Sequence, residues 1–152
     1  MIYIGIDPGR NGAIALLGNS PESTVVYPYS AENFIKPLRS MAAAWQFSEE
    51  KVIACVEHVN AMPGQGVVSM FNFGQNFGYI RGMLEALQIP YELVRPQKWK
   101  KEFSITGKKN SSIEVCKRLF PDVSLRRTDR CRKDDDNMAE ALLLAEYARR
   151  RF

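Results

Sequence analysis

The chain has 152 residues, and its 45% hydrophobic and 25% charged content is that of an ordinary globular protein, which excludes disordered and fibrous classes. One compact core fits this length, so we expect a single domain over residues 1–152. The net charge of +4 is modest but unevenly distributed.

Residues 95–133 contain thirteen Lys or Arg against four acidic residues, a local charge of +9 that leaves −5 for the rest of the chain. Trp99, Phe103 and Phe120 lie among these basic residues. Concentrated positive charge with interleaved aromatic side chains favours a polyanionic partner, whereas a solvated helix face mixes the two signs. A single solvated cluster of lysines remains the alternative for any one part of this segment.

No apolar run approaches the roughly 20 residues that cross a bilayer, and the N-terminus starts with a strand pattern instead of a signal peptide. We therefore expect a cytoplasmic protein with no membrane contact. Cys55, Cys116 and Cys131 match no zinc spacing and are expected to be reduced thiols, two of them packing residues.

Residues 2–17 are typical of a β-hairpin, with an apolar strand that ends at Asp7, a turn containing Pro8-Gly9 and Asn11-Gly12, and a second apolar strand. A carboxylate at a strand end is fixed by the sheet yet faces the turn, which suits a metal or phosphate site. The alternative is that Asp7 only initiates the turn, since Asp before Pro-Gly is favourable turn chemistry.

Residues 23–27 are β-branched and aromatic and predict a third strand. A helix should follow Ser30, a plausible N-cap, with apolar residues at spacings of three and four and a kink or delayed start at Pro37. Residues 51–57 form a nearly continuous apolar run typical of a central strand buried on both faces. This run ends at Glu57, a second acid at a strand end.

After a flexible loop over residues 60–66, a long helix is predicted over residues 67–87. Its apolar stripe consists of Met70, Phe73, Phe77, Ile80, Leu84 and Leu87. Gly74, Gly78 and Gly82 recur every four residues, and each costs about 1 kcal/mol relative to Ala in a helix. We expect the sheet or a second subunit to approach that side closely. His58, the only histidine, is assigned no role.

Residues 91–95 predict the fifth strand, and residues 106–112 a polar basic loop that leads into a helix ending at Leu119. The start of that helix, with Lys108 and Lys109, would suit a phosphate group. Solvent exposure of both lysines is the equally weighted alternative.

The last helix begins near Asn137, after three consecutive aspartates. These acids would stabilise the positive end of the helix by up to about 1 kcal/mol. However, Asp136 and Glu140 are four residues apart and share a helix face. Their negative charges repel each other, and a bound metal cation would relieve this repulsion.

The predicted elements follow the order β-β-β-α-β-α-β-α, with acids on the first strand, the fourth strand and the C-terminal helix. This arrangement resembles the ribonuclease H-like fold. The sequence is more specifically similar to the RuvC family of Holliday junction resolvases, especially its small phage-type members. The matching segments cover nearly the whole chain in order and are Gly5–Gly9, Val56–Glu57, Phe73–Gly78, Val94–Trp99, Gly107–Lys109 and Asp136–Ala145.

The resemblance implies an α/β, ribonuclease H-like domain: a mixed five-stranded sheet with helices on both faces. It also implies a homodimer that cuts four-way DNA symmetrically, leaving 5′-phosphate ends, with two Mg²⁺ ions per subunit and Mn²⁺ as a substitute. Hard oxygen ligands suit these ions. The implied catalytic and metal-binding residues are Asp7, Glu57, Asp136 and Glu140.

The resemblance also implies that the glycine-lined helix lies where the subunits meet, or packs on the sheet beside that seam, and that Lys108 and Lys109 contact phosphate. With the charge pattern, the expected DNA-binding residues are Lys98, Lys100, Lys101, Lys108, Lys109, Arg126, Arg127 and Arg130. Two departures from the family pattern stand out. Asn137 lies three residues before Glu140, so Asp136 is the expected partner and Asp135 the substitute. Asn60 lies in the loop where bacterial members place a wedging phenylalanine.

Three other functions fit parts of the sequence. The first hairpin also looks like the phosphate loop of actin-like ATPases, but those proteins need a second hairpin and a second domain, so no nucleotide cofactor is expected. A DNA-binding module would contain the acids only as structural residues. A general ribonuclease H-type nuclease would differ in substrate alone.

Overall fold

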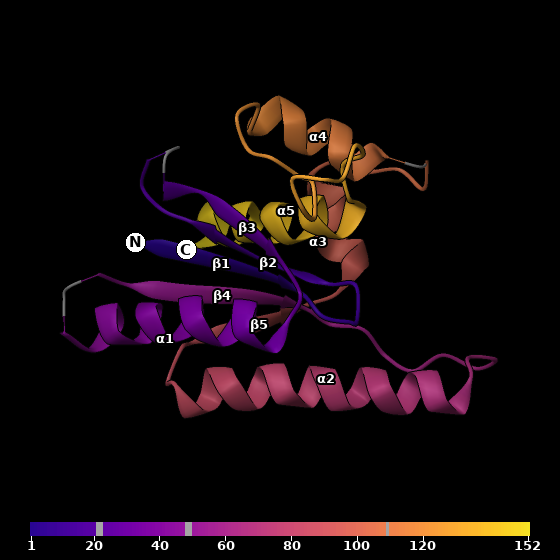
Figure 1. Cartoon of the computed structure of the whole chain (residues 1–152), viewed down its shortest axis with the longest axis horizontal. Coiled ribbons are helices and arrows are strands. Elements are labelled where there is room, and N and C mark those ends of the chain that lie inside the picture. The colour runs from indigo at the N-terminus through magenta and orange to yellow at the C-terminus, as the bar shows by residue number, and fades with distance from the viewer. Residues whose placement is uncertain (21–22, 48–49, 109) are drawn as a thin grey trace.

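A computed structural model describes residues 1–20, 23–47, 50–108 and 110–152, and Figure 1 shows its layers. The strands are β1 (Ile2–Asp7), β2 (Ala13–Leu17), β3 (Val25–Pro28), β4 (Val52–Glu57) and β5 (Tyr91–Val94). The helices are α1 (Ala31–Phe47), α2 (Val67–Ala86), α3 (Pro96–Glu102), α4 (Ser111–Leu119) and α5 (Asp136–Arg151).

The five strands form one mixed sheet in the order β3-β2-β1-β4-β5. Strand β1 pairs antiparallel with β2 and parallel with β4, and β4 pairs parallel with β5. The predicted central position of residues 51–57 is confirmed, because β4 has neighbours on both sides and is buried at five of six positions. The predicted fold, a mixed five-stranded sheet covered by helices on both faces, is likewise confirmed.

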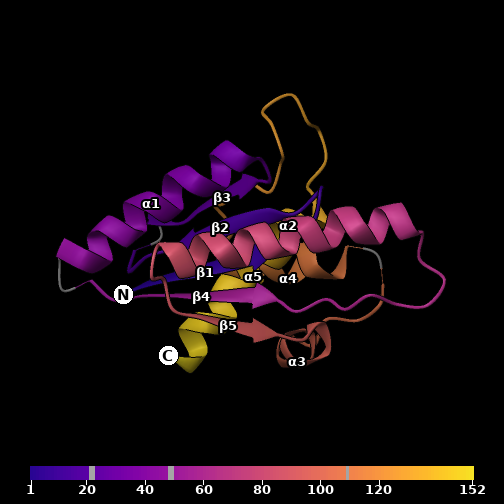
Figure 2. The same cartoon turned by 90° about the horizontal axis from the view of Figure 1, so that it is seen from below.

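Each face of the sheet has its own apolar core. Ile4, Ile6 and Val56 belong to the core under α1 and α2, whereas Cys55 belongs to the core under α3, α4 and α5. Figures 1 and 2 show the two helical layers on opposite sides of the strands. Since side chains alternate along a strand, Asp7 and Glu57 point to the α5 side, opposite to Ile6 and Val56.

Helix α5 lies directly against β1. A Cβ atom added to Gly5 would come within 2.0 Å of the Ala141 carbonyl oxygen and 2.3 Å of the Ala145 nitrogen. Such distances are far below van der Waals contact, so only glycine permits this approach of helix backbone to strand backbone. The contact brings the start of α5 over the end of β1.

Helix α1 begins as predicted, since the Ser30 hydroxyl accepts a hydrogen bond from the Asn33 amide at 3.0 Å. Pro37 lies within the helix, and α1 continues through it from Ala31 to Phe47. Helix α3 was not predicted. Pro96 occupies its first turn, where the missing N–H of proline costs nothing.

Helix α2 has two apolar sides. The predicted stripe is confirmed over its second half, where Ile80 and Leu84 are fully buried and Phe77 and Leu87 pack against the same core; Met70 and Phe73 are only half-buried and lie outside it. A Cβ atom added to Gly74, Gly78 or Gly82 would have no described atom within 4 Å, so the expectation that the sheet packs on that side is wrong. No helix in the described ranges is long and apolar enough to cross a membrane.

Candidate active site

Two buried carboxylates lie side by side at one end of the sheet. Asp7 is the last residue of β1 and Glu57 the last of β4, and the parallel register pairs Ile6 with Val56 immediately before them. Asp7 is 6% exposed and Glu57 is 7% exposed. The two acids that end apolar runs in the sequence therefore lie next to each other in the structure.

Burial strongly perturbs Asp7. Its pKa is raised well above 3.8, first because burial removes water from the carboxylate, and then because the negative charges of Glu57 and Glu140 oppose its ionisation. Lys100 acts in the opposite direction and Asp135 adds to the increase. The charges of Glu57 on β4 and Glu140 on α5 therefore both act on Asp7 of β1.

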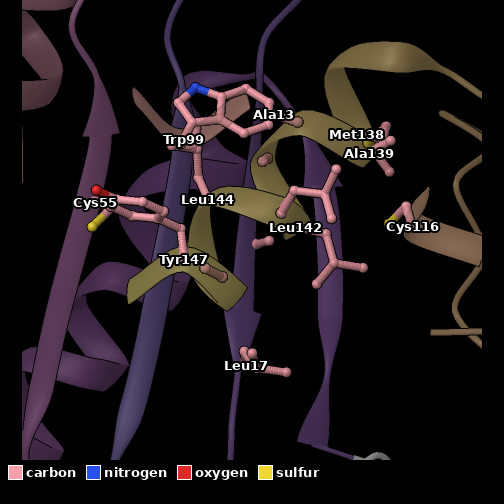
Figure 3. Packing of buried hydrophobic residues seen from close by; sticks show 14 of the residues in the cluster. Ala13, Leu17, Cys55, Trp99, Cys116, Met138, Ala139, Leu142, Leu144 and Tyr147 are labelled. Carbon is pink, nitrogen blue, oxygen red and sulfur yellow. The ribbon is translucent and has the colours of Figure 1, made fainter. Parts of the chain in front are cut away.

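Glu57 has a raised pKa for the same two reasons, burial and the charge of Glu140. Its Oε1 atom accepts a hydrogen bond from the indole Nε1 of Trp99 at 3.0 Å, which partly offsets the increase. Trp99 itself is fully buried, and Figure 3 shows it among Tyr147, Leu144 and Ala13. The rigid core under α5 therefore fixes the position of the Glu57 carboxylate.

Glu140 on α5 is the most solvated of these three acids, with an 18% exposed side chain. Its Oε1 atom pairs with Lys100 Nζ at 2.8 Å and accepts a hydrogen bond from the Ser112 hydroxyl at 3.2 Å. Lys100 lowers the pKa values of both Asp7 and Glu57, so its ammonium group acts as the counterion of the cluster. Lys100 was predicted only as a DNA-binding residue.

The three consecutive aspartates before α5 have different surroundings. Asp134 pairs with Lys117 of α4, and Asp135 caps α5 by accepting a hydrogen bond from the Met138 amide at 3.1 Å. Asp136 is exposed and lines a cavity of about 300 Å³ together with Glu140. Asp135, which the helical spacing disfavoured, is close enough to affect the pKa of Asp7 because a cap residue does not follow the helical spacing.

The oxygen donors fit a hard divalent cation in chemistry, because buried carboxylates that raise one another's pKa gain from a cation placed among them. Among the described residues, however, no three Asp, Glu, His or Cys side chains are close enough to share one ion. Lys100 and Trp99 hold the carboxylates of Glu140 and Glu57 instead. A cation would therefore compete with Lys100 for Glu140.

The other expected DNA-binding residues have different surroundings. Lys108 is exposed and lines the cavity beside Glu140, and Lys98 pairs with Glu92 at 3.3 Å. Lys101, Arg126 and Arg130 are exposed, whereas Arg127 is partly buried in contacts with the protein. Lys109 lies outside the described residues.

Sequence reasoning missed the roles of Trp99 and Ser112, which hold Glu57 and Glu140. Pro96 after a strand was an available indication of a short helix, and that helix places Trp99 and Lys100 beside the acids. Nothing local predicts the role of Ser112, because its partner is 28 residues away. The buried Cys55 and Cys116 are packing residues as expected, and burial raises the pKa of each thiol to about 12.

No protein-family model and no curated protein matches the sequence. Among solved structures, RuvC of Thermus thermophilus with its Holliday junction substrate is similar at a TM-score of 0.54 and 15% identity, over 99% of this chain and 96% of that one. The yeast mitochondrial Holliday junction resolvase Ydc2 is similar at a TM-score of 0.54 and 14% sequence identity, over 93% of this chain and 75% of that one. The fowlpox virus resolvase in complex with junction DNA is similar at a TM-score of 0.50 and 17% identity, over 98% of this chain and 99% of that one. The chain therefore has the ribonuclease H-like fold of the RuvC-type Holliday junction resolvases.

Proposed function

We propose that this protein is a cytoplasmic, single-domain Holliday junction resolvase, an endonuclease that makes paired symmetric cuts in four-way DNA and leaves 5′-phosphate ends. The observation that supports this most directly is the pair of buried carboxylates, Asp7 and Glu57, at the ends of adjacent parallel strands, on which the charge of Glu140 also acts. Mutual repulsion of buried carboxylates is unfavourable in a purely structural site, whereas a phosphodiesterase uses it to bind cations. The shared fold of junction resolvases supports the choice of substrate.

Asp7, Glu57, Asp136 and Glu140 are the proposed ligands of two Mg²⁺ ions per subunit, with Mn²⁺ as a substitute and Asp135 as the alternative to Asp136. Bound ions of this kind activate water and stabilise the departing oxygen in phosphodiester hydrolysis. Trp99 fixes the carboxylate of Glu57, and Ser112 that of Glu140. Lys100 is the counterion of Glu140, and a cation held there would take over that role.

Lys108, in the loop before α4, and Lys109 are proposed to contact DNA phosphates near the cut, and Lys98, Lys100 and Lys101 to extend this basic surface. Arg126 and Arg130 would contribute from the loop before α5, where their side chains are exposed. Log affinity falls with log salt concentration, and each lost phosphate contact reduces the steepness of that fall by about 0.9. Lys108→Gln should therefore flatten the salt dependence of junction binding by about that amount.

Paired incision requires two active sites, and we propose a homodimer formed through the outer side of α2. Val67, Val68 and Phe71 on this helix are 85%, 73% and 67% exposed. They continue the line of open positions at Gly74 and Gly78, where a second helix could approach closely. Figures 1 and 2 show α2 extending past the ends of β4 and β5, so this side is accessible.

The test is cleavage of a four-way junction, a linear duplex and an RNA–DNA hybrid, with Mg²⁺ and with EDTA. We expect Mg²⁺-dependent, symmetric cutting of the junction, and Asp7→Asn should keep junction binding while the rate falls roughly a thousandfold, since metal-assisted charge stabilisation supplies several kcal/mol. Equal cutting of duplex or hybrid would favour a general nuclease. Unchanged processing by Asp7→Asn would favour a DNA-binding module whose acids are structural, and ATP binding without DNA affinity would favour the ATPase alternative.

A further inference from the structure

The side chain of Arg127 connects two distant parts of the chain. Its Nη1 atom donates a hydrogen bond to the Asn11 carbonyl oxygen at 2.6 Å and contacts Asp135 Oδ1 at 3.4 Å. Asn11 lies in the β1–β2 turn, 116 residues away in sequence. The Arg127 side chain is only 27% exposed, unlike those of a typical DNA-contacting surface.

Asp135 is held by more than Arg127. Its Oδ1 atom also accepts the Met138 amide at 3.1 Å, which caps α5, and its own amide donates to the Leu125 carbonyl at 2.9 Å. One carboxylate oxygen therefore joins the guanidinium to the first turn of α5. The loop before α5, the β1–β2 turn and the start of α5 meet at this point.

These connected elements contain the acids of the candidate active site. The turn follows Asp7 directly, and the first turns of α5 contain Asp136 and Glu140. Arg127 contacts both of these elements, because its guanidinium binds the Asn11 carbonyl oxygen in the turn and the Asp135 carboxylate that caps α5.

Neighbouring arginines provide a contrast. Arg126 and Arg130 are exposed, and within the described ranges neither guanidinium group makes a hydrogen bond or ion pair; the one bond of this kind at Arg126 is from its backbone amide to the Ser124 hydroxyl. The three residues have the same charge and lie within five positions. Burial and partners, and not charge, set Arg127 apart.

We propose that Arg127 is a positioning residue that holds the β1–β2 turn against the N-terminus of α5 and so fixes the relative position of the acids, instead of contacting DNA. This inference rests on the proposed nuclease function for its consequence in catalysis. Its structural part, the link between Asn11 and Asp135, does not.

Arg127→Gln and the matched variant Arg126→Gln separate the two roles, because each removes one positive charge. For Arg127→Gln, the single-turnover cutting rate at saturating enzyme should fall at least tenfold and half-maximal activity should need more Mg²⁺, as for other residues that orient ligand groups. The junction dissociation constant and its salt slope should stay unchanged. Arg126→Gln should instead weaken junction binding and lower the magnitude of the salt slope by about 0.9.

Hydrogen exchange gives a readout that is independent of cutting. In Arg127→Gln, the amides of Gly12 and Met138 should exchange at least tenfold faster than in wild type and in Arg126→Gln. Arg127→Lys, which keeps the charge, should restore part of the protection. If Arg127→Gln does not fold, Asp135→Asn tests the same link, because asparagine keeps the cap but loses the charge pair.

The proposal is overturned if Arg127→Gln keeps its saturated rate, changes the salt slope as Arg126→Gln does, or leaves both amides as protected as in wild type. A wild-type protein that cuts no junction would instead refute the proposed function. Faster exchange in Arg127→Gln would then still support the link between the turn and α5.

Discussion

Helices α5 and α2 cover opposite faces of the same sheet but differ in how much of their surface the chain itself covers. Ten of the sixteen residues of α5 are buried, against three of the twenty residues of α2. Helix α5 is enclosed by the sheet, α3 and α4, whereas the outer side of α2 exposes Val67, Val68 and Phe71. Helix α5 is therefore covered by the chain itself, while α2 has exposed apolar surface that another molecule could cover.

The glycines that contact or belong to these two helices differ in the same way. Gly5 is required because α5 lies on the backbone of β1, whereas Gly78 faces open space. A glycine inside a helix costs about 1 kcal/mol relative to alanine, so the three glycines of α2 are a cost without an internal benefit. This cost is consistent with the close approach of a second copy.

The largest expected effect is that of Gly5→Ala. The new methyl group would come within 2.0 Å of the Ala141 carbonyl oxygen, and backbone atoms cannot rotate away as a flexible side chain can. We expect a loss of about 3 kcal/mol in the free energy of unfolding, at the upper end of overpacking. Urea denaturation measures it, and a loss below about 1 kcal/mol would show that α5 is not held tightly on β1.

Phe71→Ser tests whether the exposed apolar side of α2 forms the proposed dimer contact. Removing this apolar side chain from the proposed dimer contact should weaken self-association roughly tenfold to a hundredfold, in line with the about 1.5–3 kcal/mol that burial of such a side chain contributes. Sedimentation equilibrium provides the dissociation constant. Phe47→Ser is the matched control, because Phe47 is 88% exposed at the end of α1. Equal effects of the two variants, or a wild type that stays monomeric, would contradict the α2 interface.

The charged site on the α5 side should make stability depend on pH. Because the pKa of Asp7 is raised in the folded protein, its contribution to stability is complete below its ordinary pKa of 3.8 and is lost as pH rises through the raised value. In EDTA, Asp7→Asn should therefore melt a few degrees higher than wild type at pH 7.5, with the difference vanishing near pH 4. Added Mg²⁺ should stabilise wild type more than the variant. A lower melting temperature for Asp7→Asn at pH 7.5 would contradict the repulsion among these acids.

Gly78→Ala should have the smallest effect. Because no described atom lies within 4 Å of the added methyl group, helix propensity should raise the stability of the monomer by up to about 1 kcal/mol. Measured at concentrations where the dimer dissociates, this variant is also the control for Gly5→Ala. A destabilised monomer would mean that the outer side of α2 is already packed against the chain.

Much of the fold follows from local pattern. Apolar runs that end in an acid located β1 and β4, and the spacing of apolar residues located α2, because burial imposes periods of two and 3.6. Helix α3 was missed because it is short and basic, without an apolar stripe to mark it. Asp7 and Glu57 lie side by side because the ends of parallel neighbouring strands share one edge of the sheet, whereas Glu140 reaches them only through the packing of α5.

The strands, the acids that end two of them and the main helices follow from the amino-acid sequence alone, because they depend on residues close in the chain. Three further features depend on how the elements pack: Lys100 pairs with Glu140, Trp99 holds Glu57, and Asp135 is the aspartate that caps α5. Those pairings join residues from separate elements, and their geometry depends on how closely α5 approaches β1. That distance is set by packing at Gly5, which no local pattern encodes.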